Sequence, residues 1–576
     1  MHRSTMMLAA AAAAVAGLTG AFATPEQPLA GFIRAQGTHF VNKDCASIYL
    51  SGWNGWKVME EGARDPDLLA RRLDAAVDAG FNTLRFFAHG SDPDMVLQTG
   101  PGEYNEEAFR GLDRAIAMAG ERGLKLILSI SNQWKAADFA SKKQLVSYAA
   151  ELGLAPGVQC DVDACTNGGY QGGDDDEFAC YERACPNEDD AFWTNTAIRR
   201  MYKDHVRAVL ARVNTVNSKR YSSDPTILAW NVMNEPVCRR GTRNGGDGTG
   251  CADDVDAFVA DISALMKDLA PLQMVTVGQE GYYGPRETAQ RRAVNPMPPQ
   301  EGGADPLWAE KSGQSWIRNH GHDSIDFYGI HLWVDNWKVP QLEFQQAWID
   351  QHVADATATG KPMIVEEFGK VADRTSPGDV ERSRDPFFRG VYDAFKASVN
   401  SGAALRGALF WEWEDDATQG AGSERGVRRS DSTWYMIAEN AALVRNLNGQ
   451  QRGVGSCVPG REISYRSTDA AGRSWLSLGD GMVAKNVQPL AGGEGAGSDR
   501  ASCAAACAEG CAGFTFGGNG CALIGEVRSG EQHSWGYRSG EQTFWKLTER
   551  NVAALGAKVA ARGGSEAPPV AASSRN

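Results

Sequence analysis

Short and nearly continuous runs of apolar residues recur along the first three quarters of the chain. They lie at residues 48–53, 83–88, 124–131, 227–233, 274–278, 325–332, 363–367 and 408–413. Runs of this length that do not alternate with polar residues are typical of parallel strands buried on both faces. The pattern therefore predicts eight buried strands.

Stretches with apolar residues at helical spacing separate most of these runs. They cover residues 66–79, 106–122, 196–213, 253–269, 342–359, 380–399 and 432–447. Eight strand–helix units predict an α/β fold, a (β/α)8 TIM barrel with insertions. A doubly wound sheet is the alternative, but no GxGxxG motif follows the first strand to favour it.

Polar and aromatic side chains stand at the ends of most predicted strands, where a TIM barrel carries its chemistry. Any one of them could be an ordinary core or rim residue, but their shared placement predicts a site. The candidates are Trp56, Arg85, Trp134, Asn234, Glu235, His331, Trp333, Glu367 and Trp411.

Two of these candidates suit hydrolysis of a glycosidic bond. That reaction needs one carboxylic acid to protonate the leaving oxygen and a second carboxyl group to attack or to activate water. Glu235 and Glu367 can face each other across a barrel mouth, with Asn234 placed to bond a sugar 2-hydroxyl. We expect Arg85 and His331 to keep Glu367 ionised, and burial and repulsion to keep Glu235 protonated.

The tryptophans support the same chemistry, because aromatic faces stack on sugar rings. Of the 16 tryptophans, Trp56, Trp134, Trp333 and Trp411 are near predicted strand ends. Ordinary packing is the alternative for each of them.

Two motifs and a longer segment give the chain a family resemblance. Asn234-Glu235-Pro236 follows the fourth strand and Glu367-Phe368-Gly369 the seventh, and residues 190–236 extend the likeness. The region at about 31–448 resembles glycoside hydrolase family 5, most nearly the endo-β-1,4-mannanases of plant and fungal type. The resemblance implies an enzyme that cuts β-mannan internally and retains anomeric configuration.

The resemblance also implies residue roles. Glu235 would be the acid/base and Glu367 the nucleophile, while Arg85, Asn234, His331 and Trp411 stand at matching positions. Glu366 could be confused with Glu367, but adjacent strand residues point to opposite sides, so only one should enter the mouth. Glu280, after the fifth strand, is expected in a subsite or a structural role.

Three departures leave the substrate preference open. Trp333 stands where the family usually has Tyr, and its indole can donate a hydrogen bond but cannot titrate. Trp56 is displaced by one residue from the family's stacking Trp, and His89 replaces a more usual aromatic residue. A β-1,4-glucanase on the same barrel is therefore an alternative, and a carbohydrate-binding protein without catalysis is another.

Composition narrows the classes of partner. The formal net charge is −14, which argues against nucleic acid or an anionic membrane as the main partner. Apolar residues make up 42% and charged residues 23%, so wholesale disorder is excluded. We expect a monomer that needs no cofactor or metal.

The first 23 residues have the features of a secretory signal peptide. Arg3 precedes a long Ala-rich apolar stretch, and Ala21-Phe22-Ala23 has the small-x-small pattern of a cleavage site. An organellar transit peptide is the alternative. We expect secretion to the extracellular space.

The 12 cysteines then favour disulfides over thiols. Zinc is the rival, but no CxxC pair occurs. We expect a bridge between Cys238 and Cys251, which flank a Gly-rich loop after Glu235. Residues 156–190 hold four cysteines and an acidic run, which predicts a disulfide-stapled loop; calcium is the alternative there.

A smaller C-terminal domain is expected at residues 456–548. The spacing Cys503-x3-Cys507-x3-Cys511 and the later Cys521 resemble a PAN/apple-like module, which would bind wall polysaccharide or protein. A stabilising appendage without a ligand is the alternative. The Ala-, Gly- and Pro-rich residues 554–576 should be disordered.

Overall fold

The computed structural model describes most of the chain between residues 31 and 457. Within that range the described residues are 31–90, 95–134, 138–160, 162, 184–185, 191–238, 246–297, 305–376, 378–414, 424–455 and 457. Beyond it, five strands are described in backbone only. The expected signal peptide, the C-terminal tail and the cysteines at 503, 507 and 511 lie outside the described residues.

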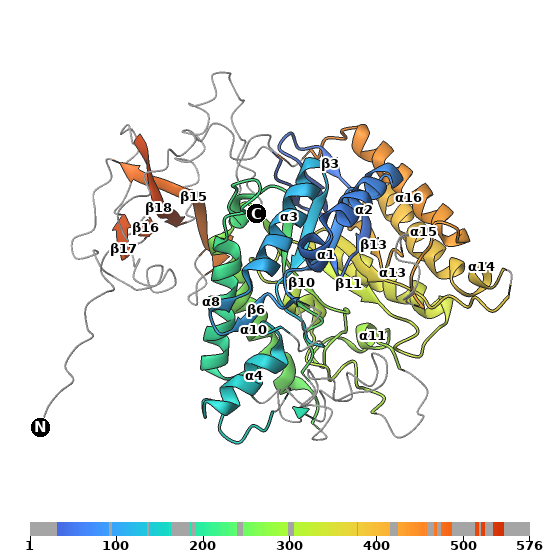
Figure 1. Cartoon of the computed structure of the whole chain (residues 1–576), viewed down its shortest axis with the longest axis horizontal. Helices are drawn as coiled ribbons and strands as arrows, with labels where there is room; N and C mark the ends of the chain where they lie inside the picture. The colour runs from blue at the N-terminus through green and yellow to red at the C-terminus, as the bar shows by residue number, and fades with distance from the viewer. Residues whose placement is uncertain are drawn as a thin grey trace, which may run out of the picture.

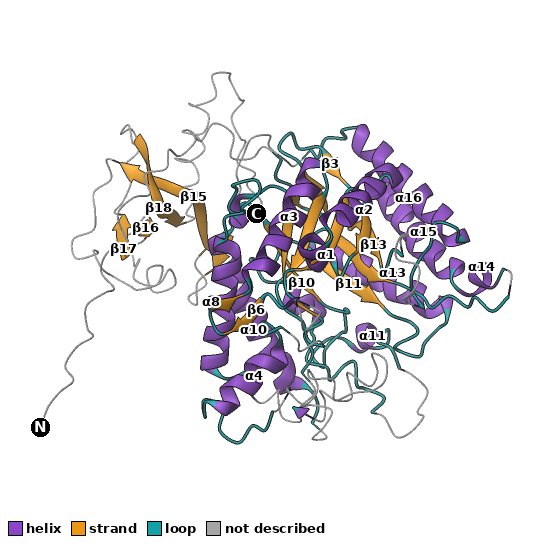
Figure 2. Ribbon diagram, in the orientation of Figure 1, coloured by secondary structure: helices purple, strands orange, loops and turns teal. Residues whose placement is uncertain are grey.

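Eight parallel strands form the centre of the molecule, as the apolar runs predict (Figures 1 and 2). In chain order they are β4 (Leu50–Asn54), β5 (Thr83–Phe87), β8 (Lys125–Ser129), β9 (Ile227–Asn234), β10 (Met274–Gly278), β11 (Tyr328–Leu332), β12 (Met363–Phe368) and β13 (Leu405–Phe410). The strand order β10-β9-β8-β5-β4-β13-β12-β11 follows the chain around the sheet.

Hydrogen bonds across the remaining gap close this sheet into a barrel. The amide of Asp326, just before β11, donates to the carbonyl of Val275 in β10 at 2.8 Å. At the other end, the His331 amide donates to the Glu280 carbonyl at 3.1 Å. The TIM-barrel prediction is confirmed.

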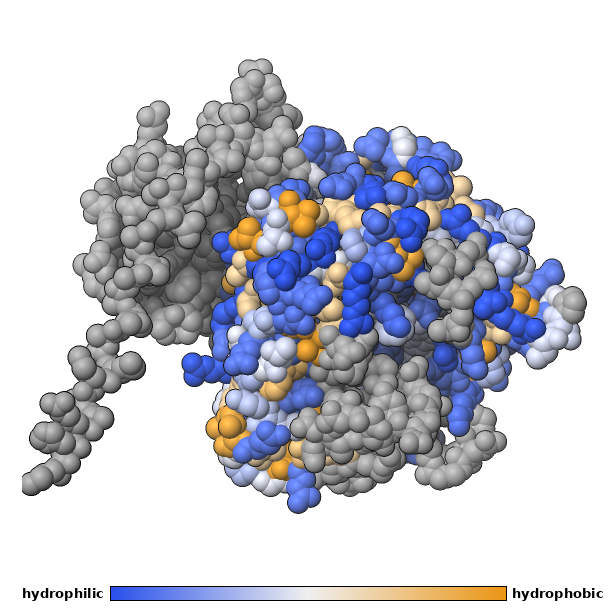
Figure 3. All heavy atoms as spheres, viewed as in Figure 1, coloured by the Kyte–Doolittle hydropathy of each residue, from blue (hydrophilic) through white to orange (hydrophobic). Residues whose placement is uncertain are grey.

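Helices surround the strands and bury their apolar faces against them (Figure 2). They are α1 (Val58–Arg64), α2 (Pro66–Ala79), α3 (Glu106–Glu121), α4 (Lys142–Glu151), α8 (Thr196–Ala211), α10 (Thr249–Leu269), α11 (Ala289–Arg292), α12 (Trp316–His320), α13 (Leu342–Thr359), α14 (Asp379–Ser383), α15 (Asp385–Ser401) and α16 (Ser432–Gly449). On the face shown in Figure 3, their outer sides are mainly polar. None of the helices in the described part has the length and apolar content to cross a bilayer.

Local signals set the limits of these helices. Asp65 accepts a hydrogen bond from the Leu68 amide at 2.9 Å and so caps α2, and Pro66 occupies its first position. Gly80 ends α2 with a φ of 91°, a backbone conformation that glycine adopts without steric cost.

Two predicted boundaries are wrong. The single helix expected at 380–399 is divided into α14 and α15, because Pro386 has no N–H to continue the first helix. The strand expected at 408–413 ends at Phe410, and Trp413 instead pairs with Val427 of the following segment.

A small antiparallel sheet closes the barrel at the end where the strands begin. It consists of β1 (Arg34–Gln36), β2 (His39–Val41) and β3 (Ser47–Ile48), with the 452–457 segment alongside. Phe40 is completely buried and packs edge-on against Phe327 at 5.3 Å, in an apolar cluster with the first residues of the strands. A disulfide joins Cys45 to Cys457 and fastens the two segments together.

Within the described residues, other cysteines form two further bridges. The expected bridge between Cys238 and Cys251 is present. Cys160 pairs with Cys185, while Cys165 and Cys180 of the same loop lie outside the described residues.

The C-terminal region contains a separate five-stranded antiparallel sheet. Its strands are β14 (Arg466–Thr468), β15 (Ser474–Lys485), β16 (Gly513–Gly517), β17 (Gly520–Ile524) and β18 (Ser534–Lys546), in the order β14-β15-β18-β16-β17. The resemblance to a PAN/apple-like module stays a prediction.

The closing sheet should contribute measurably to stability. Because Phe40 is completely buried at the base of the barrel, we expect Phe40→Ala to lower the free energy of unfolding by about 3–5 kcal/mol. Tyr435→Ala is the control, since Tyr435 is 76% exposed and its loss should cost less than about 0.5 kcal/mol. Denaturant unfolding of both variants measures the difference, and equal losses would contradict this role for Phe40.

Candidate active site

Glu235 stands immediately after β9, with a backbone φ of 49° that turns the chain out of the strand. Its amide donates to the Gly278 carbonyl of β10 at 2.5 Å, which fixes this turn. The Trp134 indole N–H donates to Glu235 Oε2, and His331 Nδ1 lies 2.6 Å from Oε1. Both carboxylate oxygens are therefore held, and the residue is only 9% exposed.

Glu367 lies in β12 and is buried in the same end of the barrel. Arg85 Nη1 donates to its Oε1, and the Trp333 indole N–H donates to Oε2 at 3.3 Å. Hydrogen bonds from a guanidinium and an indole hold the carboxylate in one orientation.

Glu366 also turns into the barrel, which corrects the expectation that only one of the two adjacent glutamates can do so. Its Oε1 lies 3.4 Å from Arg85 Nε and its Oε2 lies 3.3 Å from His331 Nε2. The strand registers on both sides of β12 shift at these positions, and such a bulge breaks the usual alternation of side chains.

Arg85 and His331 are the two cations of the cluster, and both are completely buried. Arg85 also donates to Asn54 Oδ1 at 3.1 Å and to Asn234 Oδ1 at 2.7 Å. Asn234 Nδ2 in turn donates to Asn132 Oδ1 at 3.1 Å. The amide of Asn234 is thus oriented by its neighbours beside Glu235.

His331 bridges the carboxylates and carries a positive charge at neutral pH. Burial alone would lower its pKa, but the charge of Glu367 and the hydrogen bonds to Glu235 and Glu366 raise it to about 10. An imidazolium donates from both nitrogens, which matches its two carboxylate partners.

The pKa shifts of the two candidate catalytic groups are opposite in direction to the ones expected. Burial raises the pKa of Glu235, but the hydrogen bond and charge of His331, the Trp134 hydrogen bond and the charge of Arg85 together outweigh burial and hold that pKa below its ordinary value. Burial raises the pKa of Glu367 above its ordinary value, against the charges of His331 and Arg85. The reason is that the short hydrogen bond of His331 goes to Glu235 and not to Glu367.

Glu280 is a further buried carboxyl group beside this cluster. Burial and the charge of Glu235 raise its pKa to about 8. The Gln314 amide nitrogen donates to Glu280 Oε2, and Gln314 also contacts the Pro236 carbonyl at 3.4 Å. Glu280 is therefore neutral at pH 7 and packs behind the turn that carries Glu235.

Glu235, His331 and Glu367 lie close enough together to be compared with a metal site. One ligand atom from each lies within 4.8 Å of the other two. However, the imidazolium of His331 has no free lone pair, and its two N–H groups are directed at carboxylates. The donor set suits a charge cluster better than metal ligation.

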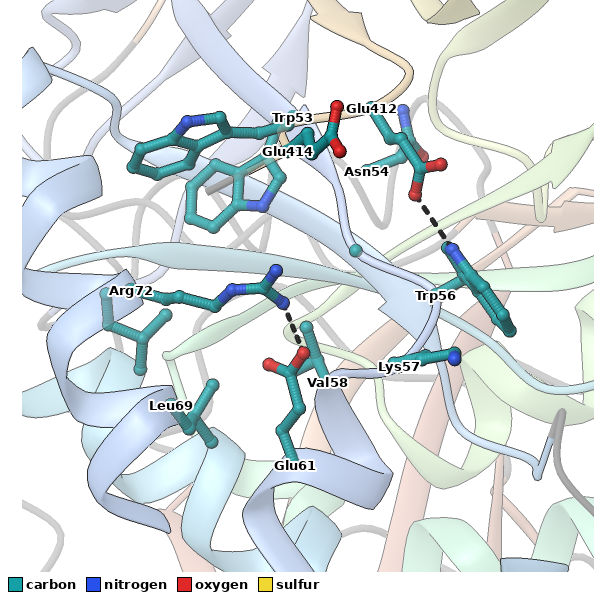
Figure 4. A pocket seen from close by; sticks show the side chains of 13 residues that line it. Trp53, Asn54, Trp56, Lys57, Val58, Glu61, Leu69, Arg72, Glu412 and Glu414 are labelled. Carbon is teal, nitrogen blue, oxygen red and sulfur yellow. Dashed lines mark hydrogen bonds and ion pairs between the residues drawn. The ribbon is translucent and has the colours of Figure 1, made fainter. Parts of the chain in front are cut away.

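The other expected aromatic residues lie at two places. Trp411 meets the ring of Trp333, the donor to Glu367, edge-on at 6.0 Å. Trp56 donates to Glu412 Oε2 at 2.8 Å and lies at a neighbouring cavity of about 150 Å³, at the carboxyl ends of β4 and β13 (Figure 4). Arg72 and Glu61 form an ion pair on the wall of this cavity.

Two positions in the site were missed from the sequence. Asn231 donates to both oxygens of Glu366, at 3.0 and 3.1 Å, and Gln314 supports Glu280. A polar residue inside an apolar strand requires a buried partner, so the Asn231 position carried a signal that could have been used. Gln314 belongs to no periodic segment and carried none.

Comparison with known proteins shows the family of this chain. Residues 30–296 and 301–425 match a family described as GH family 5 β-mannosidase-like. The mannan endo-1,4-β-mannosidase 7 of Arabidopsis thaliana is 32% identical over 398 residues, which are 68% of this chain and 79% of that protein. The mannan endo-1,4-β-mannosidase 4 of Oryza sativa subsp. japonica is 32% identical over 78% of this chain and 88% of its own.

Solved structures share the fold. The glycoside hydrolase family 5 mannosidase from Rhizomucor miehei superposes with a TM-score of 0.55 at 19% identity, over 74% of this chain and 100% of its own. The endo-1,4-β-mannanase from the same organism gives a TM-score of 0.53 at 20% identity. The match covers 72% of this chain and 99% of that enzyme.

The buried carboxyl of Glu280 should make stability depend on pH. Its pKa is about 8 in the folded protein and near 4.5 in the unfolded chain, so the folded state holds this proton more tightly. Wild-type stability relative to Glu280→Gln should therefore be greatest below pH 4.5 and fall as the pH rises to about 8.

Denaturant unfolding at pH 5 and pH 8 measures this difference. Glu343→Gln, at an exposed position at the start of α13, is the control and should leave the difference between the two pH values unchanged. The same pH dependence in wild type and Glu280→Gln would contradict the assignment.

Proposed function

Because this chain belongs to the β-mannosidase-like group of glycoside hydrolase family 5, we propose that it is a secreted, retaining endo-β-1,4-mannanase. The substrate is the β-1,4-linked mannose backbone of mannan, galactomannan or glucomannan, cut at internal bonds. The names of the plant relatives support the substrate and the internal cut. The two buried glutamates supply the chemistry.

The observation that carries the retaining mechanism is the short distance between the two carboxylates. Glu235 and Glu367 each place an oxygen within 4.8 Å of the other. Retaining glycosidases hold their carboxyl groups about 5–5.5 Å apart, while inverting enzymes need about 6.5–9.5 Å to seat a water. The spacing supports retention, and the family motifs assign the roles: Glu367 attacks the anomeric carbon, and Glu235 protonates the leaving oxygen and then activates water.

His331 is placed to decide which carboxylate carries the proton. Its Nδ1 lies 2.6 Å from Glu235 and 3.4 Å from Glu367, so a small movement transfers its hydrogen bond. Donation from Nδ1 to Glu367 instead would stabilise the nucleophile as the anion. Glu235 would then bind from solvent the proton that the leaving oxygen requires.

Secretion is proposed from the first 23 residues, through their apolar stretch and small-x-small cleavage pattern. Disulfides, which persist in oxidising compartments, support it. The C-terminal module is proposed to hold the enzyme on wall polysaccharide and to raise its local concentration there.

A β-1,4-glucanase remains the alternative, because the barrel and both glutamates suit either sugar. Product analysis separates the two. Linear β-1,4-mannan should yield short manno-oligosaccharides, while carboxymethylcellulose should yield few reducing ends. Cleavage of the glucan alone would overturn the mannanase proposal.

The nucleophile is tested by Glu367→Ala. Loss of the attacking carboxylate should lower turnover of mannan by more than about a thousandfold, and azide should restore part of it by attacking from the vacated face. A retaining enzyme then gives an α-configured glycosyl azide, which NMR identifies. A β-configured product, or full activity in the variant, would contradict the assigned role.

A further inference from the structure

The indole of Trp333 is the neutral donor to Glu367, and its ring is held on several sides. Its Nε1–H donates to Glu367 Oε2 at 3.3 Å, and the ring is 9% exposed. Trp411 meets it edge-on at 6.0 Å. Beneath the ring lies Gly369, where an added Cβ would come within 2.9 Å of the indole, so only glycine leaves room for it.

Arg425 covers this ring from a different segment of the chain. Its guanidinium carbon lies 5.6 Å from the centre of the Trp333 ring, a distance suited to a cation–π contact. Its Nη2 donates to Asn336 Oδ1 at 2.7 Å. Asn336 follows Trp333 in the same loop. Arg425 therefore contacts the indole by a cation–π interaction and the loop that carries it by a hydrogen bond.

The 424–431 segment that presents Arg425 is firmly anchored. Val427 exchanges backbone hydrogen bonds with Glu412 and Glu414 at 2.8 and 3.0 Å. The Gly426 carbonyl, next to Arg425, accepts from Arg374 at 2.9 Å and from Arg384 at 3.0 Å.

Asp431 completes the anchor at the end of the segment. Its carboxylate forms ion pairs with Arg374 at 2.7 Å and Arg384 at 2.5 Å. Arg384 is completely buried, so this end of the segment has a fixed position. The guanidinium of Arg425 is thus presented from a rigid support.

We propose that Arg425 is a positioning residue for the nucleophile: by packing over Trp333 it fixes the indole N–H that orients Glu367. The inference rests on the proposed function, in which Glu367 attacks the sugar. An indole has no second protonation state, so its donor strength is constant with pH and depends only on where the ring is held. Arg425, Trp411 and Gly369 together determine that placement.

Kinetics of three variants test the proposal. Arg425→Ala should lower kcat on linear β-1,4-mannan about tenfold and leave KM within about twofold. The reason is that the orientation of the Glu367 carboxylate changes while no contact with the sugar is lost. Arg425→Lys, which keeps the charge without the planar face, should lose less. Arg429→Ala is the matched control: Arg429 lies in the same segment but packs over Trp413 and Trp434, at 5.4 and 5.5 Å.

A double-mutant cycle asks whether Arg425 acts through the indole. In a Trp333→Phe background, Arg425→Ala should lower kcat by less than about twofold. A full tenfold loss in that background would overturn the proposal, and so would a rise in KM at unchanged kcat. A loss in Arg429→Ala equal to that in Arg425→Ala would also overturn it.

A second measurement needs no activity and so separates this inference from the proposed function. The indole N–H resonance of Trp333 is identified by its absence in Trp333→Phe. It should shift and exchange faster with solvent in Arg425→Ala, and stay unchanged in Arg429→Ala. An unchanged resonance in Arg425→Ala would overturn the positioning role, while a shifted one in an enzyme inactive on mannan would leave it standing and reject the substrate.

Discussion

The burial of like charges at the mouth of the barrel is the constraint on which the rest of the site depends. Glu235, Glu366 and Glu367 share two buried cations, Arg85 and His331. Isolated buried charges are costly, and removing one partner leaves the others uncompensated. Because these groups come from β5, β9, β11 and β12, the cluster can form only when the barrel is closed.

That imbalance of charge explains the protonation of the site. With more carboxylates than cations, burial and neighbouring negative charge raise the pKa values of Glu280 and Glu367. The pKa of Glu235 is lowered instead, because His331 and Trp134 donate to it and the charge of Arg85 acts on it. The position of one imidazole therefore sets the ionisation of two carboxyl groups, and neutral donors such as Trp333 act as fixed supports around it.

The sequence predicted the barrel well because buried parallel strands and amphipathic helices leave strong periodic signals. It failed where the signal was short or overridden. The closing strands β1 to β3 have two or three residues each, too few for a period, and Pro386 divided a helix whose apolar pattern continued through it. The predictions of strands and helices relied on periodicity. The three closing strands and the break at Pro386 do not depend on periodicity, so the predictions missed them.

For the site, residue identity was easier to predict than geometry. Strand ends placed Arg85, Glu235, His331 and Glu367 together correctly. The inward turn of Glu366 depends on a bulge, and the preference of His331 for Glu235 depends on less than one ångström between 2.6 and 3.4 Å. Periodicity and residue type carry no information at that scale.

The small sheet beneath the barrel has a consequence for how the enzyme meets a surface. The Cys45–Cys457 bridge places the exit of the chain at the floor, where the strands begin, while the glutamates lie where they end. Anything joined after Cys457 is therefore tethered at the end of the barrel opposite Glu235 and Glu367. A tether at that end does not block the end with the two glutamates, so attachment and substrate binding can take place at opposite ends of one barrel.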